Sequence, residues 1–312
     1  IQIFSGEEKG HVYSRYAIPT VDAVARKIAK LETYGTDLKA QAYLTSSGMS
    51  AISNCMLSIC ESGKRILASM DLYGGSLELL KKIIERLGIS VDFVDFSNLD
   101  KLEDTIKSKK YHALFFETPT NPLLKSFPIQ DISELCKKYH LKSIIDNTFC
   151  TSYLQRPFEY GIDFVIYSAT KYLSGHGNCT AGVVLSTDIS FMEAEFWKTL
   201  KLTGGICSPF EAWTLNNGLK TLPLRMDRHA ENALQLAQFL QSSRSVNQVY
   251  YPFLSDHSSY SIAKKQMLLG GGMLSFELNG GLEAAKRFMD ATKVMTNAPT
   301  LGDTDTLLLH PY

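Results

Sequence analysis

A lysine at the end of an apolar run has the clearest chemical potential in this sequence. Lys171 follows the strand-forming run 164–167 and comes just after Ser168 and Thr170. At the carboxyl edge of a parallel sheet, an amine in this position would meet hydroxyl groups able to hold a phosphate. A lysine forms a Schiff base only when its amine can lose its charge, which a desolvated setting favours. The pattern indicates a Schiff-base lysine; the alternative is a surface lysine that caps a strand.

Three other apolar runs also end in side chains capable of chemistry. They lead into Asp71-Leu72-Tyr73-Gly74-Gly75, Glu117-Thr118-Pro119-Thr120-Asn121-Pro122 and Asp146-Asn147-Thr148. Because the carboxyl ends of parallel strands meet at one edge of a sheet, we expect these stretches to converge on Lys171.

Together these residues could bind pyridoxal phosphate, which needs an amine, a carboxylate at its ring nitrogen, phosphate donors and an aromatic side chain against the ring. Asp146 is the candidate for the ring nitrogen, with a turn aspartate as the alternative. Tyr73 could lie on the ring and act as acid or base, although a core tyrosine is the plainer interpretation. Asn121 could bind the cofactor hydroxyl or a substrate carboxylate, or be only a turn residue.

The phosphate has a candidate site at a helix start. Gly48 and Met49 follow Ser46-Ser47 and open a predicted helix after the short strand 41–45. Free N–H groups at such a helix start can bind a phosphate. Ordinary N-capping by Ser46 or Ser47 explains the same pattern equally well.

The composition excludes several other classes of function. The 312 residues are 45% hydrophobic and include 32 basic and 32 acidic side chains. A balanced charge gives no bulk attraction to nucleic acid or to an anionic membrane, and no apolar run is long enough to cross a bilayer. The six cysteines form no CxxC pair, which favours reduced thiols and a cytoplasmic protein. The scattered histidines predict no metal site.

The order of elements predicts an α/β fold with a mainly parallel sheet between helices. Apolar strands alternate with amphipathic helices from a helix that begins near Pro19 to a strand at 181–186. Residues 1–20 are predicted to form an arm, residues 21–222 the cofactor-binding domain, and residues 223–312 a smaller C-terminal α/β domain. Pro223 is taken as the boundary, with the next helix at 228–240.

These motifs, in this order, strongly resemble the Cys/Met metabolism family of pyridoxal-phosphate enzymes, the trans-sulfuration enzymes. The resemblance covers nearly the whole chain. It rests on Tyr13-Ser14-Arg15, Ser47-Gly48-Met49, Leu72-Tyr73-Gly74-Gly75, Glu117 to Pro122, Asp146-Asn147-Thr148-Phe149, Ser168-Ala169-Thr170-Lys171-Tyr172, Gly218 to Leu222, Arg225-Met226 and Gly272 to Phe276.

The resemblance implies a pyridoxal-phosphate fold of type I in a homotetramer built from active dimers. It implies that Lys171 binds the cofactor covalently, that Asp146 faces its ring nitrogen and that Tyr73 stacks on the ring. The implied phosphate ligands are Gly48, Met49, Ser168 and Thr170, with Tyr13 and Arg15 reaching across from the neighbouring subunit. Asn121 and Thr300 are implied beside the substrate.

The implied reaction is γ-elimination on L-cystathionine, L-methionine or L-homocysteine, giving 2-oxobutanoate, ammonia and a thiol or cysteine. The alternatives are γ-replacement on an activated homoserine ester and a cofactor-binding protein that has lost catalysis. Gly75 matches the cystathionine enzymes, whereas the methionine-cleaving members have a cysteine there. In this family the arginine that binds the substrate carboxylate would follow Tyr312, so a chain ending there is expected to bind substrate weakly.

Overall fold

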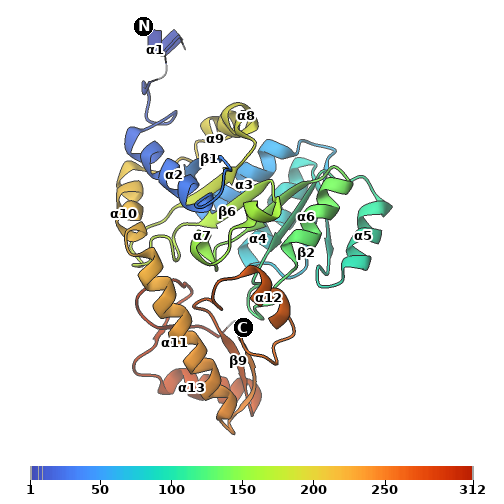
Figure 1. The fold of residues 1–312 in the computed structure, drawn as a ribbon, viewed down its shortest axis with the longest axis vertical. Coiled ribbons are helices and arrows are strands. Elements are labelled where there is room, and N and C mark those ends of the chain that lie inside the picture. The colour runs from blue at the N-terminus through green and yellow to red at the C-terminus, as the bar shows by residue number, and fades with distance from the viewer. Residues whose placement is uncertain (1, 6, 9, 311–312) are drawn as a thin grey trace.

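Figure 1 shows a large α/β body with a smaller C-terminal part beneath it. This computed structural model describes residues 2–5, 7–8 and 10–310. The large body contains the central sheet, and helix α11 (Leu222–Ser242) leads from it into the smaller part. The predicted division of the chain into an arm, a large domain and a smaller domain from residue 223 stays a prediction.

The central sheet has seven strands, and all but one run parallel, as predicted. Its spatial order is β1-β7-β6-β5-β4-β2-β3, with β7 antiparallel to both of its neighbours. The strands are β1 (Gln41–Thr45), β2 (Arg65–Ser69), β3 (Ser90–Val94), β4 (Ala113–Glu117), β5 (Lys142–Asp146), β6 (Phe164–Ser168) and β7 (Gly182–Ser186). The carboxyl ends of β1, β2, β4, β5 and β6 therefore share one edge.

Alternating side chains along each strand supply two cores, one on each face of the sheet. In β4, Leu114 and Phe116 join one buried cluster, whereas Ala113 and Phe115 join the other. Such a strand is apolar throughout because both of its faces are covered.

Helices cover both faces of the sheet. The first cluster includes residues of α2 (Pro19–Glu32), α5 (Leu99–Ser108), α6 (Ile129–Lys138), α7 (Thr151–Leu154) and α10 (Pro209–Leu219). The second includes residues of α3 (Gly48–Ile59), η1 (Leu80–Ile84), η4 (Met192–Phe196) and α9 (Trp197–Thr203). The remaining helical segments of this body are α1 (Gln2–Ser5), α4 (Gly74–Leu79), η2 (Glu85–Leu87), η3 (Pro157–Tyr160) and α8 (Ile189–Phe191).

The smaller part packs α11 against a two-stranded antiparallel sheet. That sheet pairs β8 (Val246–Tyr250) with β9 (Ser275–Leu278), and Ala233, Val249 and Tyr251 belong to its core. The other elements are α12 (Tyr260–Gln266), α13 (Gly281–Ala291), β10 (Thr296–Asn297) and β11 (Leu307–Leu308).

The predicted helix 228–240 was wrong at its start, because α11 begins at Leu222 and contains Pro223 in its first turn. A proline fits there because its missing N–H would have no acceptor within the helix anyway. Pro223 therefore marks where a helix begins, not a break between elements.

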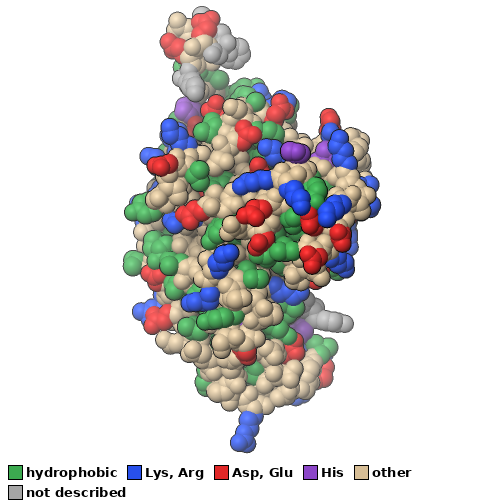
Figure 2. All heavy atoms as spheres, turned by 45° about the vertical axis from the view of Figure 1, so that its right-hand side comes forward, with side chains coloured by type: hydrophobic (Ala, Val, Ile, Leu, Met, Phe, Trp, Pro, Cys, Tyr) green, Lys and Arg blue, Asp and Glu red, His purple; other side chains and the backbone are tan. Residues whose placement is uncertain are grey.

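Charges of both signs are interspersed on the face shown in Figure 2. Among the described residues, no helix is long and apolar enough to span a membrane. The described residues also contain no cluster of three or more His, Cys, Asp or Glu side chains able to hold a metal ion.

Candidate active site

Lys171 lies in the turn after β6, at the carboxyl edge of the sheet. Its Nζ donates to Thr300 Oγ1 at 2.8 Å, and burial lowers the pKa of the amine. Gly302 (φ +83°) brings the Thr300 loop against the lysine, since a Cβ there would lie 2.6 Å from Tyr172 N and 2.8 Å from the Lys171 carbonyl carbon. Thr300, predicted beside the substrate, is therefore in direct contact with the predicted catalytic lysine.

Asp146 ends β5, next to β6 in the sheet. Its Oδ1 accepts from Thr148 N at 3.0 Å and from Thr148 Oγ1 at 2.5 Å. Thr148 Oγ1 in turn accepts from Ser168 N at 2.8 Å, which ties the two strand ends together. Burial raises the pKa of Asp146, whereas the bonds from Thr148 oppose that shift. Sequence reasoning quoted Thr148 only as part of a motif and missed its role as this link.

Two of the predicted phosphate ligands, Gly48 and Ser168, lie against each other. A Cβ on Gly48 would stand 2.7 Å from Ser168 Cβ, so only glycine lets the start of α3 approach the end of β6 this closely. Ser47 caps α3 by accepting from Ser50 N at 3.1 Å, as the N-cap alternative expected. Because the first N–H groups of a helix have no acceptor within it, those of Gly48 and Met49 can still serve a ligand.

Thr170 is partly committed to the backbone. Its Oγ1 donates to Ala181 O at 3.2 Å and accepts from Ala181 N at 3.1 Å. These two bonds hold the lysine turn against the residue before β7. The oxygen of Thr170 thus has a structural role beside the predicted phosphate role.

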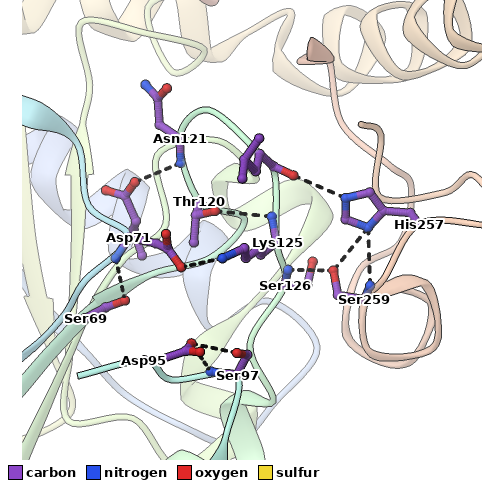
Figure 3. Close-up of polar contacts among 12 residues, drawn as sticks. Ser69, Asp71, Asp95, Ser97, Thr120, Asn121, Lys125, Ser126, His257 and Ser259 are labelled. Carbon is purple, nitrogen blue, oxygen red and sulfur yellow. Dashed lines mark hydrogen bonds and ion pairs between the residues drawn. The ribbon is translucent and has the colours of Figure 1, made fainter. Parts of the chain in front are cut away.

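Tyr73 and Asn121 come from loops that follow β2 and β4, and a carboxyl group joins them. Glu117 Oε2 accepts from Tyr73 N and Glu117 Oε1 from Asn121 N, each at 3.0 Å. Tyr73 is 53% exposed, so its ring is open to a ligand. In Figure 3 the side chain of Asn121 points away from Lys125 and Asp71, while its backbone nitrogen is hydrogen-bonded.

Glu117 was not among the predicted site residues. The sequence does contain a pattern that could have identified Glu117, because this charged residue ends the otherwise apolar run of β4. A strand buried on both faces ends in a charge only where a polar partner is available.

Arg15 lies against α9 of its own chain, and Tyr13 packs against Arg15 and Tyr16. The Arg15 guanidinium carbon is 5.2 Å from the centre of the Tyr13 ring and 5.1 Å from that of Tyr16, and the guanidinium also donates to Lys201 O. None of these contacts involves Lys171 or Asp146. Their predicted role in a neighbouring subunit stays a prediction.

Arg225 fixes the lysine turn from the side of the smaller part. It is 9% exposed and donates to Tyr172 O at 2.7 Å, to Gly218 O at 2.8 Å and to Thr221 Oγ1 at 3.1 Å. Gly175 makes room for it, because a Cβ there would lie 1.9 Å from the guanidinium. The sequence pointed to Arg225 only as part of a family motif.

The assembled residues can support nucleophilic and proton-transfer chemistry at one edge of the sheet. An amine of lowered pKa follows β6, and the neighbouring strand β5 ends in a half-buried carboxyl group. The start of α3 meets the end of β6, and the loop after β2 carries an exposed tyrosine. Burial favours the neutral, nucleophilic form of the amine.

Comparison with known proteins agrees with this chemistry. The model of the Cys/Met metabolism PLP-dependent enzyme family matches residues 1–312. The chain is 40% identical to an L-methionine gamma-lyase of Fusobacterium nucleatum subsp. nucleatum over 312 residues, which is 99% of this chain and 77% of that protein. It is also 40% identical to a cystathionine beta-lyase of Lactococcus lactis subsp. cremoris over 306 residues, 98% of this chain and 78% of that one.

Solved structures match equally well. Cystathionine gamma synthase from Xanthomonas oryzae pv. oryzae superposes with a TM-score of 0.93 at 32% identity, covering 98% of this chain and 77% of that one. Cystathionine gamma-lyase from Lactobacillus plantarum superposes with a TM-score of 0.92 at 36% identity, covering 98% and 78%.

Proposed function

Because the chain belongs to the Cys/Met metabolism family of PLP-dependent enzymes, we propose that it is a carbon–sulfur lyase acting by γ-elimination on L-cystathionine, L-methionine or L-homocysteine. The products are 2-oxobutanoate, ammonia and a thiol or cysteine. The observation that best supports the proposal is the position of Lys171, whose half-buried amine of lowered pKa follows β6 at the same sheet edge where the neighbouring β5 ends in Asp146.

The family's cofactor is pyridoxal 5′-phosphate, and the residues present fit it. Both bonds from Thr148 fall on Asp146 Oδ1, and no donor of the described part of the chain bonds Oδ2, which can therefore face a protonated ring nitrogen. The close approach of Gly48 to Ser168 leaves helix N–H groups and a hydroxyl side by side, as a phosphate requires. Lys171 would hold the cofactor covalently through Nζ.

The cofactor, when bound, withdraws electrons from the carbon next to the substrate's amino group. The protein's own residues then move protons. The Lys171 amine takes the α-proton, which needs its neutral form, and Thr300 orients that amine through the 2.8 Å contact. The Tyr73 hydroxyl would deliver a proton to the leaving sulfur, and the Asn121 side chain would bind the cofactor hydroxyl or the substrate carboxylate.

We propose that the protein is a cytoplasmic homotetramer of active dimers, with Tyr13 and Arg15 completing a neighbour's phosphate site. The exposure of Tyr13, at 52%, and the six buried, unpaired cysteines support these two proposals. Light scattering should give the mass of four chains, and Arg15→Ala should weaken cofactor binding without changing the mass. A monomer that binds the cofactor as tightly as the tetramer contradicts the shared site.

The first experiment is the visible spectrum of the purified protein, with borohydride reduction and peptide mass analysis. We expect an absorption band of bound cofactor and an adduct on Lys171. No band and no adduct would overturn the cofactor assignment. A cofactor-loaded protein with no turnover on any substrate would instead favour the alternative of a binding protein.

Product analysis with L-cystathionine distinguishes the possible reactions. γ-Elimination yields 2-oxobutanoate and cysteine, whereas β-elimination, suggested by the beta-lyase relative, yields pyruvate and homocysteine. A new thioether from an activated homoserine ester and a thiol would favour γ-replacement, which the gamma-synthase structure keeps as the second candidate.

A further inference from the structure

Glu117 is a buried carboxyl group that binds two loops at once. It ends β4, is 7% exposed, and uses one oxygen for Tyr73 N and the other for Asn121 N, each at 3.0 Å. The two loops follow different strands, β2 and β4, which are neighbours in the sheet. A single side chain therefore fixes the distance between the backbones at Tyr73 and Asn121.

The setting of Glu117 is unusual for a structural carboxylate. Within the described residues it forms no ion pair, although a buried carboxylate is normally paired with a cation. Its register partner across β4 and β5 is Asp146, a second, half-buried carboxyl group. Burial and then the charge of Asp146 raise the pKa of Glu117 to about 8, which the two N–H donors oppose.

We propose that Glu117 is a positioning residue of the active site, which holds the Tyr73 and Asn121 loops together at the sheet edge where β5 ends in Asp146. This inference rests on the proposed function, because that function is what assigns catalytic roles to Tyr73 and Asn121. Glu117 makes no contact with substrate in this role; it acts through the two residues whose N–H groups it accepts.

A second contact joins the same two loops. Lys125 Nζ, from the Asn121 loop, lies 3.0 Å from Asp71 Oδ2, from the Tyr73 loop (Figure 3). The Asn121 loop also closes on itself, because Lys125 N donates to Thr120 Oγ1 at 3.2 Å. This ion pair is partly exposed, so it contributes less than the buried bonds to Glu117.

The far side of the Asn121 loop is held by the smaller part of the molecule. Ser126 N donates to Ser259 Oγ at 2.8 Å, and His257 Nε2 is 3.2 Å from Leu123 O (Figure 3). Ser275 Oγ donates to Pro122 O. The loop is thus fixed on the outside by these bonds, and Glu117 is its connection to Tyr73.

The variant Glu117→Gln tests whether the two hydrogen bonds of Glu117, and not only its buried side-chain volume, hold the loops. A glutamine keeps the size of the side chain but offers one acceptor oxygen, and its NH₂ group cannot accept from the second N–H. One of the two amides must lose its partner. Glu117→Asp keeps both oxygens but is one methylene shorter, so it also fails to reach both loops.

The test is hydrogen exchange in the cofactor-loaded protein, read at the Tyr73 and Asn121 amides. In Glu117→Gln, exchange at one or both should be about tenfold faster, as expected for the loss of one buried hydrogen bond. The circular dichroism of the cofactor band should change, and kcat/KM should fall about tenfold.

Glu32→Gln is the matched control, because Glu32 is also a buried glutamate with a pKa raised to about 8 but contacts neither loop. It should leave all three readouts unchanged.

The wild-type protein gives an independent test if the variant does not fold. Both amides should exchange far more slowly than in a free peptide, even though the Tyr73 side chain is half exposed. Free-peptide rates at either amide would overturn the proposal, and so would an equal effect of Glu117→Gln and Glu32→Gln. Hydrogen exchange does not depend on turnover. Protected amides in a protein without lyase activity would therefore refute the proposed function but not the role of Glu117 in holding the two loops.

Discussion

Glu117 and Glu32 are two buried glutamates with the same pKa, raised to about 8, in two different regions of the molecule. Glu117 lies at the carboxyl edge of the sheet and accepts two backbone N–H groups. Glu32 ends α2 on a covered face of the sheet and accepts only the Tyr167 hydroxyl, while its Oε1 has no partner among the described residues. A shifted pKa alone therefore does not identify a functional group; its place in the topology does.

The largest expected effect is at the carboxyl edge itself. Lys171→Ala should lower turnover by roughly a thousandfold or more, since a catalytic proton carrier is worth about 10²–10⁴ in rate. It should also abolish the borohydride-stable cofactor adduct. Thermal stability should change little, because within the described part of the chain the Lys171 amine bonds only to the exposed Thr300. Lys198→Ala, which removes an exposed lysine, is the control and should keep the adduct.

On the covered face, the pH dependence of stability should reveal Glu32. Burial raises its folded pKa from 4.5 to about 8, so the folded chain keeps a proton that the unfolded chain releases. The free energy of unfolding must then fall as pH rises from about 4.5 to 8, by roughly 4–5 kcal/mol from this group. In urea unfolding measured at several pH values, Glu32→Gln should remove this contribution to the fall in the free energy of unfolding. Glu283→Gln, at an exposed site, should not change the fall. An unchanged slope would mean that Glu32 ionises normally.

A smaller effect is expected from the partner of Glu32. Tyr167→Phe removes the hydroxyl that donates to Glu32 and accepts from Asn147 Nδ2 at 2.9 Å. Because it leaves a buried acid without a donor, we expect a loss of about 1–3 kcal/mol in the free energy of unfolding. Tyr250→Phe removes an exposed hydroxyl and should cost less than about 0.5 kcal/mol. Equal losses in the two variants would contradict the buried network.

The smallest effect returns to the carboxyl edge, at Gly75. A Cβ there would lie 2.5 Å from Tyr73 Cε1, so Gly75→Ala must displace the tyrosine ring. Since that ring is half exposed and can move, we expect a fall in kcat/KM of only a few-fold, with no loss of stability. Gly74→Ala is the matched control, because a Cβ at Gly74 meets nothing within 4 Å. A larger loss in Gly74→Ala than in Gly75→Ala would exclude ring displacement as the cause.

Much of the fold could be predicted from the sequence because its signals are local. Strand β1 begins and ends where the sequence pattern placed it, at residues 41 and 45, since it is short and is followed by a polar turn. The start of α11 was missed because a proline reads as a break along the chain but is harmless in the first turn of a helix. The strand-end residues suggested the cofactor class, whereas the family rested on motifs along nearly the whole chain and the lyase chemistry on what that resemblance implies.

By itself, the sequence determined which side chains stand at the carboxyl edge, because strand polarity and burial follow from neighbouring residues. Only the tertiary structure decided which of them touch. The contacts from Glu117 to Tyr73, from Lys171 to Thr300 and from Tyr167 to Glu32 span 44, 129 and 135 residues of chain. Nothing local encodes such pairings, since they exist only after strand order and helix packing bring distant segments together.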